Sequence, residues 1–112
     1  MGKRKRKRLL DSIMGKVQKA MTKQSKIAQI KREAAERIND ICPAWKQSNL
    51  NARAVELNGI RFERELTEHE ADEWQGMLNI CQAIKQIRLD SDTAENTVNT
   101  LQTIEEIEAF SW

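Results

Sequence analysis

The sequence predicts an all-α protein, with a long N-terminal amphipathic helix of coiled-coil type followed by a small helical hairpin. Three observations predict this fold class. Residues that favour helix dominate the composition, and proline occurs once in 112 residues. Apolar residues recur at helical spacing over most of the chain. Residues that favour strands are too scattered to build a sheet. Because only 39% of the residues are hydrophobic, we expect a thin core that is shared with a partner.

Charge is distributed very unevenly along the chain. Residues 1–46 contain 14 basic and 4 acidic side chains, which gives 14 − 4 = +10. Residues 47–112 contain 5 basic and 13 acidic side chains, which gives 5 − 13 = −8. This polarity suggests either head-to-tail contacts between copies or a positive end directed at an anionic partner.

The chain begins with a basic arm, residues 1–8, that contains six consecutive cations. Because like charges repel, we expect the arm to be disordered by itself. It is either a solvated tail or a contact for an anionic partner, such as an acidic protein surface or DNA. Lysines at helical spacing would extend that contact or form a solvated face. The candidate residues for it are Lys3, Arg4, Lys5, Arg6, Lys7, Arg8, Lys16, Lys19, Lys23 and Lys26.

Residues 9–42 form the second segment, in which one long amphipathic helix is expected from Leu9 to Ile41. Apolar residues fill most of the a, d and e positions of a heptad repeat, and Gln24 and Lys31 interrupt the a positions. A stripe this broad is typical of helix bundles and of coiled coils with three or more strands, so we expect self-association or docking on another protein. The oligomer or docking seam consists of Leu10, Ile13, Met14, Val17, Met21, Ile27, Ile38 and Ile41.

The third segment, residues 43–112, is the expected hairpin module. Pro43 cannot continue the hydrogen-bond ladder of a helix and predicts a bend. A second helix is expected from Pro43 to about residue 57, ended by Gly59 in a left-handed conformation. Trp45 is expected to pack on the facing helix near Ile84 and Ile87.

The pattern Thr67-Glu-His-Glu70 is a capping box and predicts that the next helix starts at residue 68. This helix continues to at least Leu89. At residues 90–92 it either stops or runs on to about Ala109, and the continuous heptad phase favours one long helix. Its expected buried face is Ala71, Trp74, Met77, Leu78, Cys81, Ile84 and Ile87. Phe110 and Trp112 are expected to anchor the chain end in an apolar site.

The sequence shows no constellation of catalytic residues. No Ser, Cys or Thr is placed with a pair formed by the single histidine, His69, and a carboxylate, as a catalytic triad would require. One histidine also leaves no His-rich metal site, and a glycine-rich phosphate loop is absent from the sequence. We therefore expect no enzyme activity, no cofactor and no small-molecule substrate. Cys42 and Cys81 are expected as small buried apolar groups rather than as a disulfide or metal ligands. The sequence contains no apolar run that would span a bilayer, and no membrane partner is expected.

Several short motifs, in order, resemble a small helical module of tailed-bacteriophage tail proteins over about residues 34–112. The resemblance includes proteins of tail fibres and baseplates and small tail-assembly chaperones. It is carried by Pro43-Ala-Trp-Lys-Gln-Ser-Asn49, Ala52-Arg-Ala-Val-Glu-Leu57, the Thr67 start, Glu73-Trp74, and Ile84-Lys-Gln-Ile-Arg-Leu-Asp-Ser-Asp92. The hairpin-motif residues in this set are Pro43, Trp45, Lys46, Gln47, Asn49, Trp74, Ile84, Ile87 and Arg88.

The resemblance implies a structural component of a bacteriophage virion, in the tail or its connection. Such a protein would act by helix-mediated oligomerisation with itself and by docking on other tail proteins. It would be found in the virion, and in the host cytoplasm during assembly. Residues 1–31 fall outside the resemblance, which favours a stand-alone small virion protein. The alternatives are a tail-assembly chaperone that is absent from the particle, and a non-specific nucleic-acid-binding protein that uses the basic arm.

Overall fold

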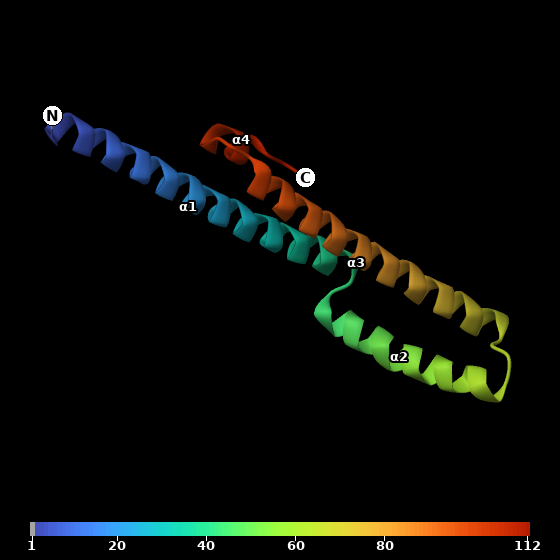
Figure 1. The fold of residues 1–112 in the computed structure, drawn as a ribbon. Coiled ribbons are helices and arrows are strands. Elements are labelled where there is room, and N and C mark those ends of the chain that lie inside the picture. Colours follow the sequence, from blue (N-terminus) through green and yellow to red (C-terminus); the bar gives the residue numbers. More distant parts are fainter. Residues whose placement is uncertain (1) are drawn as a thin grey trace. The chain divides into compact units, whose positions relative to one another are not determined.

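The computed structural model describes residues 2–112, with side chains from Leu9 onward, and the chain is all-α as predicted. Over this part of the chain no strand occurs. The four helices are α1 (Gly2–Ile41), α2 (Ala44–Glu63), α3 (Glu68–Thr100) and α4 (Ile104–Ala109) (Figure 1). The expected bend at Pro43 is confirmed, because α1 ends two residues before it and α2 begins directly after it.

The chain divides into two compact units, and each is described by itself. Unit 1 consists of the chain up to Glu33 together with Asp90–Trp112, and unit 2 consists of Ala34–Leu89. The helices α1 and α3 each contribute residues to both units.

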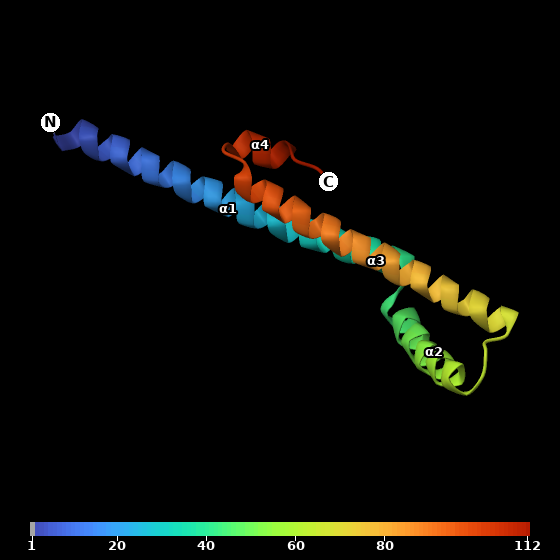
Figure 2. The ribbon, with the colours of Figure 1, turned by 45° about the vertical axis from the view of Figure 1, so that its right-hand side comes forward.

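Unit 1 is built from the first part of α1, the last part of α3, and α4. Figures 1 and 2 show that α4 turns back alongside the end of α3. Its core consists of Ile30, Ala94, Val98 and Ile107, each at most 3% exposed. Full burial of a large aliphatic side chain stabilises a fold by about 1.5–3 kcal/mol. Because these are the buried apolar side chains of unit 1, the cluster is the main hydrophobic contribution to the stability of the unit.

Unit 2 pairs α2 with the first part of α3, and the two helices run side by side in both ribbon views (Figures 1 and 2). Its buried apolar residues are Ala34, Cys42, Leu57, Met77 and Ile84. An ion pair also joins the two helices, with Arg53 Nε donating to Glu73 Oε2 at 2.8 Å.

The first helix begins earlier than the sequence analysis predicted. Residues 2–8 continue α1 in the structure, whereas a disordered arm was expected up to residue 8. Lysine and arginine have high helix propensities, and extending an existing helix costs far less than nucleating one. The side chains of residues 2–8 lie outside the described part, and so do the contacts predicted for Lys3–Arg8.

The second helix continues past Gly59, so the predicted end of this helix is wrong. No described glycine has a positive φ, and α2 ends only at Glu63, where Arg64 becomes extended. A glycine inside a helix costs about 1 kcal/mol relative to alanine. Full burial of Leu57 and partial burial of Ile60 on the same helix outweigh that cost.

The third helix runs through Asp90–Asp92, as the heptad phase favoured, but its predicted extension to Ala109 is wrong. The helix ends at Thr100, and α4 is a separate helix. Thr103 caps α4, because its Oγ1 accepts a hydrogen bond from the Glu106 N–H at 3.1 Å. The Glu106 carboxylate in turn accepts from the Gln102 N–H at 3.1 Å. The Thr-x-x-Glu pattern at residues 103–106 is the sequence signal for this second start.

Some side chains that were predicted to be buried, on the first part of α3 and at Trp45, are exposed in the structure. Met77 and Ile84 are buried, and Trp74 and Ile87 are half-buried. Ala71, Leu78 and Cys81, by contrast, are exposed, so their predicted burial is wrong. Trp45 is 68% exposed, and its predicted packing on the facing helix is also wrong. The helix that begins at Ala44 presents Trp45 to solvent, while Leu57, further along α2, fills the core of unit 2.

The difference in burial between Leu57 and Trp45 gives a stability prediction. Leu57→Ala should lower the free energy of unfolding by about 2–5 kcal/mol, because it leaves a cavity in the core of unit 2. Trp45→Ala should change it by no more than about 0.5 kcal/mol, because the side chain is largely in solvent. Urea denaturation of both variants measures the two effects. A loss for Trp45→Ala as large as that for Leu57→Ala would contradict the structure.

Candidate functional site

The first helix has two faces that carry apolar residues, and only one of them is covered within unit 1. The covered face presents Ile30, which is buried against Ala94, Val98 and Ile107. Partly buried residues complete the contact: Ile27, Leu101, Phe110 and Trp112. The two terminal aromatic residues therefore pack on the core of their own chain.

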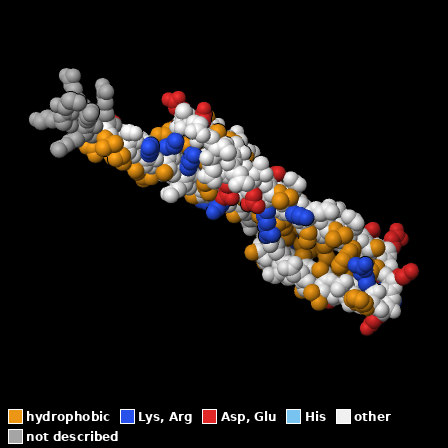
Figure 3. All heavy atoms as spheres, in the orientation of Figure 1, with side chains coloured by type: hydrophobic (Ala, Val, Ile, Leu, Met, Phe, Trp, Pro, Cys, Tyr) orange, Lys and Arg blue, Asp and Glu red, His pale blue; other side chains and the backbone are white. Residues whose placement is uncertain are grey.

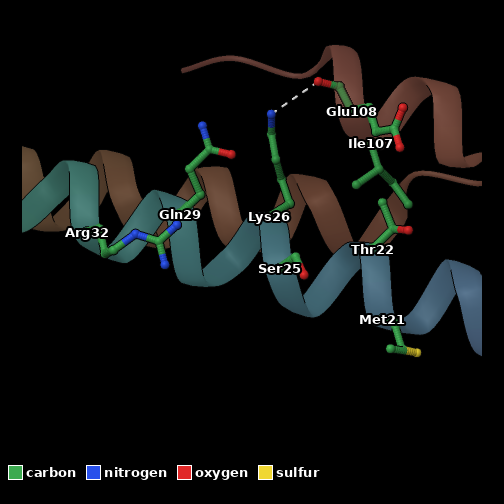
Figure 4. Close-up of a pocket in the computed structure, with 8 residues that line it drawn as sticks. All are labelled: Met21, Thr22, Ser25, Lys26, Gln29, Arg32, Ile107 and Glu108. Atoms are coloured by element: carbon green, nitrogen blue, oxygen red, sulfur yellow. Dashed lines mark hydrogen bonds between the residues drawn. The ribbon is translucent and has the colours of Figure 1, made fainter.

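Two lysines on the covered face bind the ends of helices in the same unit. Lys23 Nζ donates to the backbone oxygen of Asn99 at 2.8 Å, one residue before α3 ends. Lys26 Nζ donates to the backbone oxygen of Glu108 at 3.2 Å, near the end of α4 (Figure 4). The last carbonyls of a helix lack intrahelical partners and carry partial negative charge, so cations stabilise them. Half of the predicted lysine face thus has a role inside the chain.

Two further polar contacts fasten acidic and aromatic groups to α1. Lys31 Nζ lies 3.6 Å from Glu95 Oε1, a buried oxygen that has no hydrogen-bond partner. At the end of the chain, Trp112 Nε1 donates to Glu33 Oε2 at 2.8 Å. The acidic segment 90–112, with six carboxylates and no basic residue, therefore binds the basic helix of its own chain.

An open polar hollow of about 460 Å³ lies next to these contacts, between α1 and α4. Figure 4 shows Thr22 and Lys26 directed toward Ile107 and Glu108 of α4. Its lining consists of Met21, Thr22, Ser25, Lys26, Gln29, Arg32, Ile107 and Glu108. Among these lining residues Glu108 is the one carboxylate, and no His or Cys occurs.

The second face of α1 carries a row of large apolar side chains that nothing in the described structure covers. We call this row the apolar stripe; it consists of Leu9, Leu10, Ile13, Met14, Val17 and Met21. Each side chain is between 48% and 62% exposed. Figure 3 shows hydrophobic atoms gathered along this part of α1. Because isolated exposed apolar residues are common but contiguous rows are not, the apolar stripe is a candidate interaction surface.

The structure places the residues of the predicted seam in different surroundings. Five of them, Leu10, Ile13, Met14, Val17 and Met21, lie in the apolar stripe. Ile27 packs against the unit 1 core instead. In unit 2, Ile38 is half-buried and Ile41 is 37% exposed.

Ile30 is the central residue of the unit 1 core, and sequence reasoning missed it. It occupies a g position, outside the a, d and e positions from which the seam was chosen. The spacing Ile27, Ile30, Ala34 is a helical signal that could have indicated the second face.

The predicted hairpin motif lies largely around a groove in unit 2, between α2 and α3. Two adjoining hollows, of about 270 and 460 Å³, share Leu50 and Ile80. Figure 3 shows hydrophobic side chains exposed between these two helices. Motif residues that line the groove are Lys46, Gln47, Asn49, Ile84 and Arg88. The groove therefore combines an apolar floor with a mainly cationic edge.

One of these motif residues, Gln47, and the second tryptophan, Trp74, have defined structural contacts. Gln47 Nε2 donates to the Cys42 backbone oxygen at 2.8 Å, which holds the bend before α2 in place. Trp74 lies under the Arg61 guanidinium, 5.0 Å from the ring centroid, an arrangement that favours a cation–π interaction.

The turn between α2 and α3 is held by charge-assisted hydrogen bonds, and the predicted capping box is confirmed. The Glu70 N–H donates to Thr67 Oγ1 at 3.2 Å, and the Thr67 N–H donates to Glu70 Oε1 at 2.9 Å. Arg64 donates to both Glu70 carboxylate oxygens, at 2.8 and 3.1 Å. These donors stabilise the charged form and lower the pKa of Glu70 from 4.5 to about 2, with the Arg64 hydrogen bond as the largest cause.

No reactive cluster stands out among the side chains that the structure describes. His69 is exposed and lies 3.1 Å from a carboxylate oxygen of Glu73. Cys42 and Cys81 are free thiols. From Leu9 onward, no group of three His, Cys, Asp or Glu side chains could hold a metal ion. The helices in this part of the chain also lack an apolar stretch long enough to cross a bilayer.

The chain matches no known protein family. Comparisons with curated proteins and with solved structures give no match either. The resemblance to phage tail modules therefore stays a prediction from the motifs.

The low pKa of Glu70 leads to a prediction about stability and pH. A carboxyl group whose pKa is lowered by folding stabilises the fold above its unfolded pKa, and that contribution is lost as the pH falls toward the folded pKa. The melting temperature should therefore decrease between about pH 4.5 and pH 2, and this decrease should be smaller in Glu70→Gln. Glu105→Gln, which changes an exposed carboxyl group of α4, is the matched control. Identical pH profiles for Glu70→Gln and the parent protein would show that Glu70 does not couple folding to pH.

Proposed function

We propose that this chain is a structural component of a bacteriophage particle, in the tail or its connection, and that it docks through the apolar stripe of α1. The exposure of six large apolar side chains on one helix face carries the docking part of the proposal. A helix with such a face usually binds an apolar groove or another helix. The assignment to a phage particle rests on the motif resemblance over residues 34–112.

The groove of unit 2 supports a second contact in the same assembly. Five residues of the hairpin motif line it, and Trp45 lies exposed nearby on α2. Exposed tryptophans and arginines are enriched at the energetic centres of protein interfaces. A chain with an apolar stripe on one unit and an apolar groove on the other is suited to connecting two neighbouring proteins.

Binding of nucleic acid by the predicted lysine face is less well supported. Lys23 and Lys26 donate to carbonyl groups of their own chain, which leaves fewer free cations along the helix. Self-association through the apolar stripe is the alternative mode of docking.

Mass spectrometry of purified particles of the phage that encodes this chain tests the proposal. We expect the chain to be present at a fixed ratio to the tail proteins. Val17→Asp, which places a charge in the middle of the apolar stripe, should reduce the amount in particles by at least about tenfold, the equivalent of 1.4 kcal/mol. Ser12→Asp makes the same change of charge at an exposed position outside the stripe and should leave the amount unchanged.

Absence of the chain from particles whose assembly requires it would contradict the role of a virion component. That result would instead identify a tail-assembly chaperone. Equal incorporation of the Val17→Asp and parent chains would show that the apolar stripe is not the docking surface.

A further inference from the structure

Resting on the docking function proposed above, the structure points to a specific partner for the apolar stripe: we propose that it binds an acidic amphipathic helix of another protein. Three features favour this partner: the spacing of the stripe, its surrounding charge, and the acidic segment that α1 already binds.

The spacing of the apolar stripe suits a helical partner. Leu10 and Val17 occupy a positions, Ile13 occupies a d position, and Met14 and Met21 occupy e positions of one heptad frame. A heptad repeat presents its side chains to a second helix in knobs-into-holes packing. Residues 9–41 contain no aromatic side chain, whereas helices that lie on a lipid surface commonly insert Trp or Phe. The stripe therefore fits a helix better than a bilayer.

The charge of this part of α1 disfavours a second copy of the same helix as the partner. Residues 2–21 contain eight basic side chains and one acidic side chain, 8 − 1 = +7. A parallel pair would place the six cations of residues 3–8 beside the same six cations of the other copy. An antiparallel pair centred on Val17 would place residues 3–8 opposite residues 26–31, which include Lys26 and Lys31 and no acidic residue. Both arrangements bring like charges together, which is unfavourable.

An acidic helix has the opposite charge, and unit 1 shows that α1 accepts one. The segment 90–112 carries six acidic and no basic residues, and it packs on the neighbouring face of α1. Lysines of α1 bind this segment through the Glu95 carboxylate and through the carbonyl oxygens of Asn99 and Glu108.

Lys16 provides the equivalent cation at the edge of the apolar stripe. It is exposed, and it lies one helical turn from Ile13 and from Ala20 on the same helix. It occupies a g position, from which a side chain reaches an acidic residue of a partner helix. An incoming acidic helix would therefore bury its apolar face on the stripe and pair a carboxylate with Lys16.

The test uses the full chain and a pair of synthetic helices about four heptads long. Both carry Leu at a and d; one carries Glu at e and g, and the other carries Lys there. Titration calorimetry should show that the Glu peptide binds and that its dissociation constant increases with salt. The Lys peptide should not bind. Val17→Asp and Lys16→Glu should each increase the dissociation constant of the Glu peptide at least about tenfold, while Ser12→Asp should leave it nearly unchanged.

Circular dichroism of each variant shows whether the helices remain folded, so that a loss of binding is not confused with unfolding. Three results would overturn the proposal. Equal binding of the Glu and Lys peptides would show that charge does not select the partner. Self-association of the chain in sedimentation, abolished by Val17→Asp, would identify a second copy as the partner. Binding to vesicles that contain phosphatidylserine, lost in Val17→Asp and without any binding of the Glu peptide, would identify a lipid surface.

These outcomes are separate from those of the proposed function. A chain that is found in particles but does not bind the Glu peptide would retain its structural role and lose the proposed partner. A chain that binds the Glu peptide but is absent from particles would retain the partner chemistry and lose the role as a virion component.

Discussion

The burial of Ile30 of α1 against Val98 of α3 and Ile107 of α4 is the interaction on which unit 1 depends. All three side chains are at most 1% exposed, and Val98 and Ile107 follow Ile30 by 98 − 30 = 68 and 107 − 30 = 77 positions in the sequence. This contact determines which face of α1 is used inside the chain. It also places Lys23 and Lys26 at the carboxyl ends of α3 and α4, where cations stabilise unpaired carbonyl groups. Because this contact uses one face of α1, the apolar stripe on another face of the same helix stays in solvent.

The same contact resolves much of the charge polarity of the sequence. The basic helix and the acidic end of the chain lie together in unit 1, so a large part of the attraction between them is satisfied within one molecule. Residues 2–33 carry 12 basic and 2 acidic side chains, 12 − 2 = +10, and residues 90–112 carry −6, which leaves +4 for the unit. This remaining charge is concentrated at the N-terminal end of α1, in the part that also carries the apolar stripe. A surface that is both apolar and cationic is suited to a partner that is both apolar and acidic.

The fold class, the bend at Pro43 and the Thr67–Glu70 cap followed from local signals, because helical periodicity, proline and capping boxes act over a few residues. Three features did not follow. Gly59 predicts a helix end, but burial of Leu57 stabilises α2 enough for the helix to continue beyond Gly59. The large side chain of Trp45 predicts a core position, but size does not determine which face of the helix a side chain occupies, and Trp45 faces solvent. The choice between the two faces of α1 depends on which one meets Val98 and Ile107, and no local pattern encodes that long-range contact. The sequence predicts that Phe110 and Trp112 anchor the chain end. Only the structure shows that they pack on the core of unit 1 and that Trp112 binds Glu33 of α1.

The helix α1 keeps one face for its own chain, and we propose that the apolar stripe stays open until a partner binds. Methionine oxidation by dilute hydrogen peroxide, measured residue by residue with mass spectrometry, tests it with native side chains. Met14 and Met21 belong to the stripe and are 59% and 62% exposed, whereas Met77 is 9% exposed in unit 2 and serves as the internal reference. In the free chain, Met14 and Met21 should oxidise much faster than Met77, and in the assembled complex both should become protected. Protection of Met14 and Met21 in the free chain, or unchanged reactivity in the complex, would contradict the account.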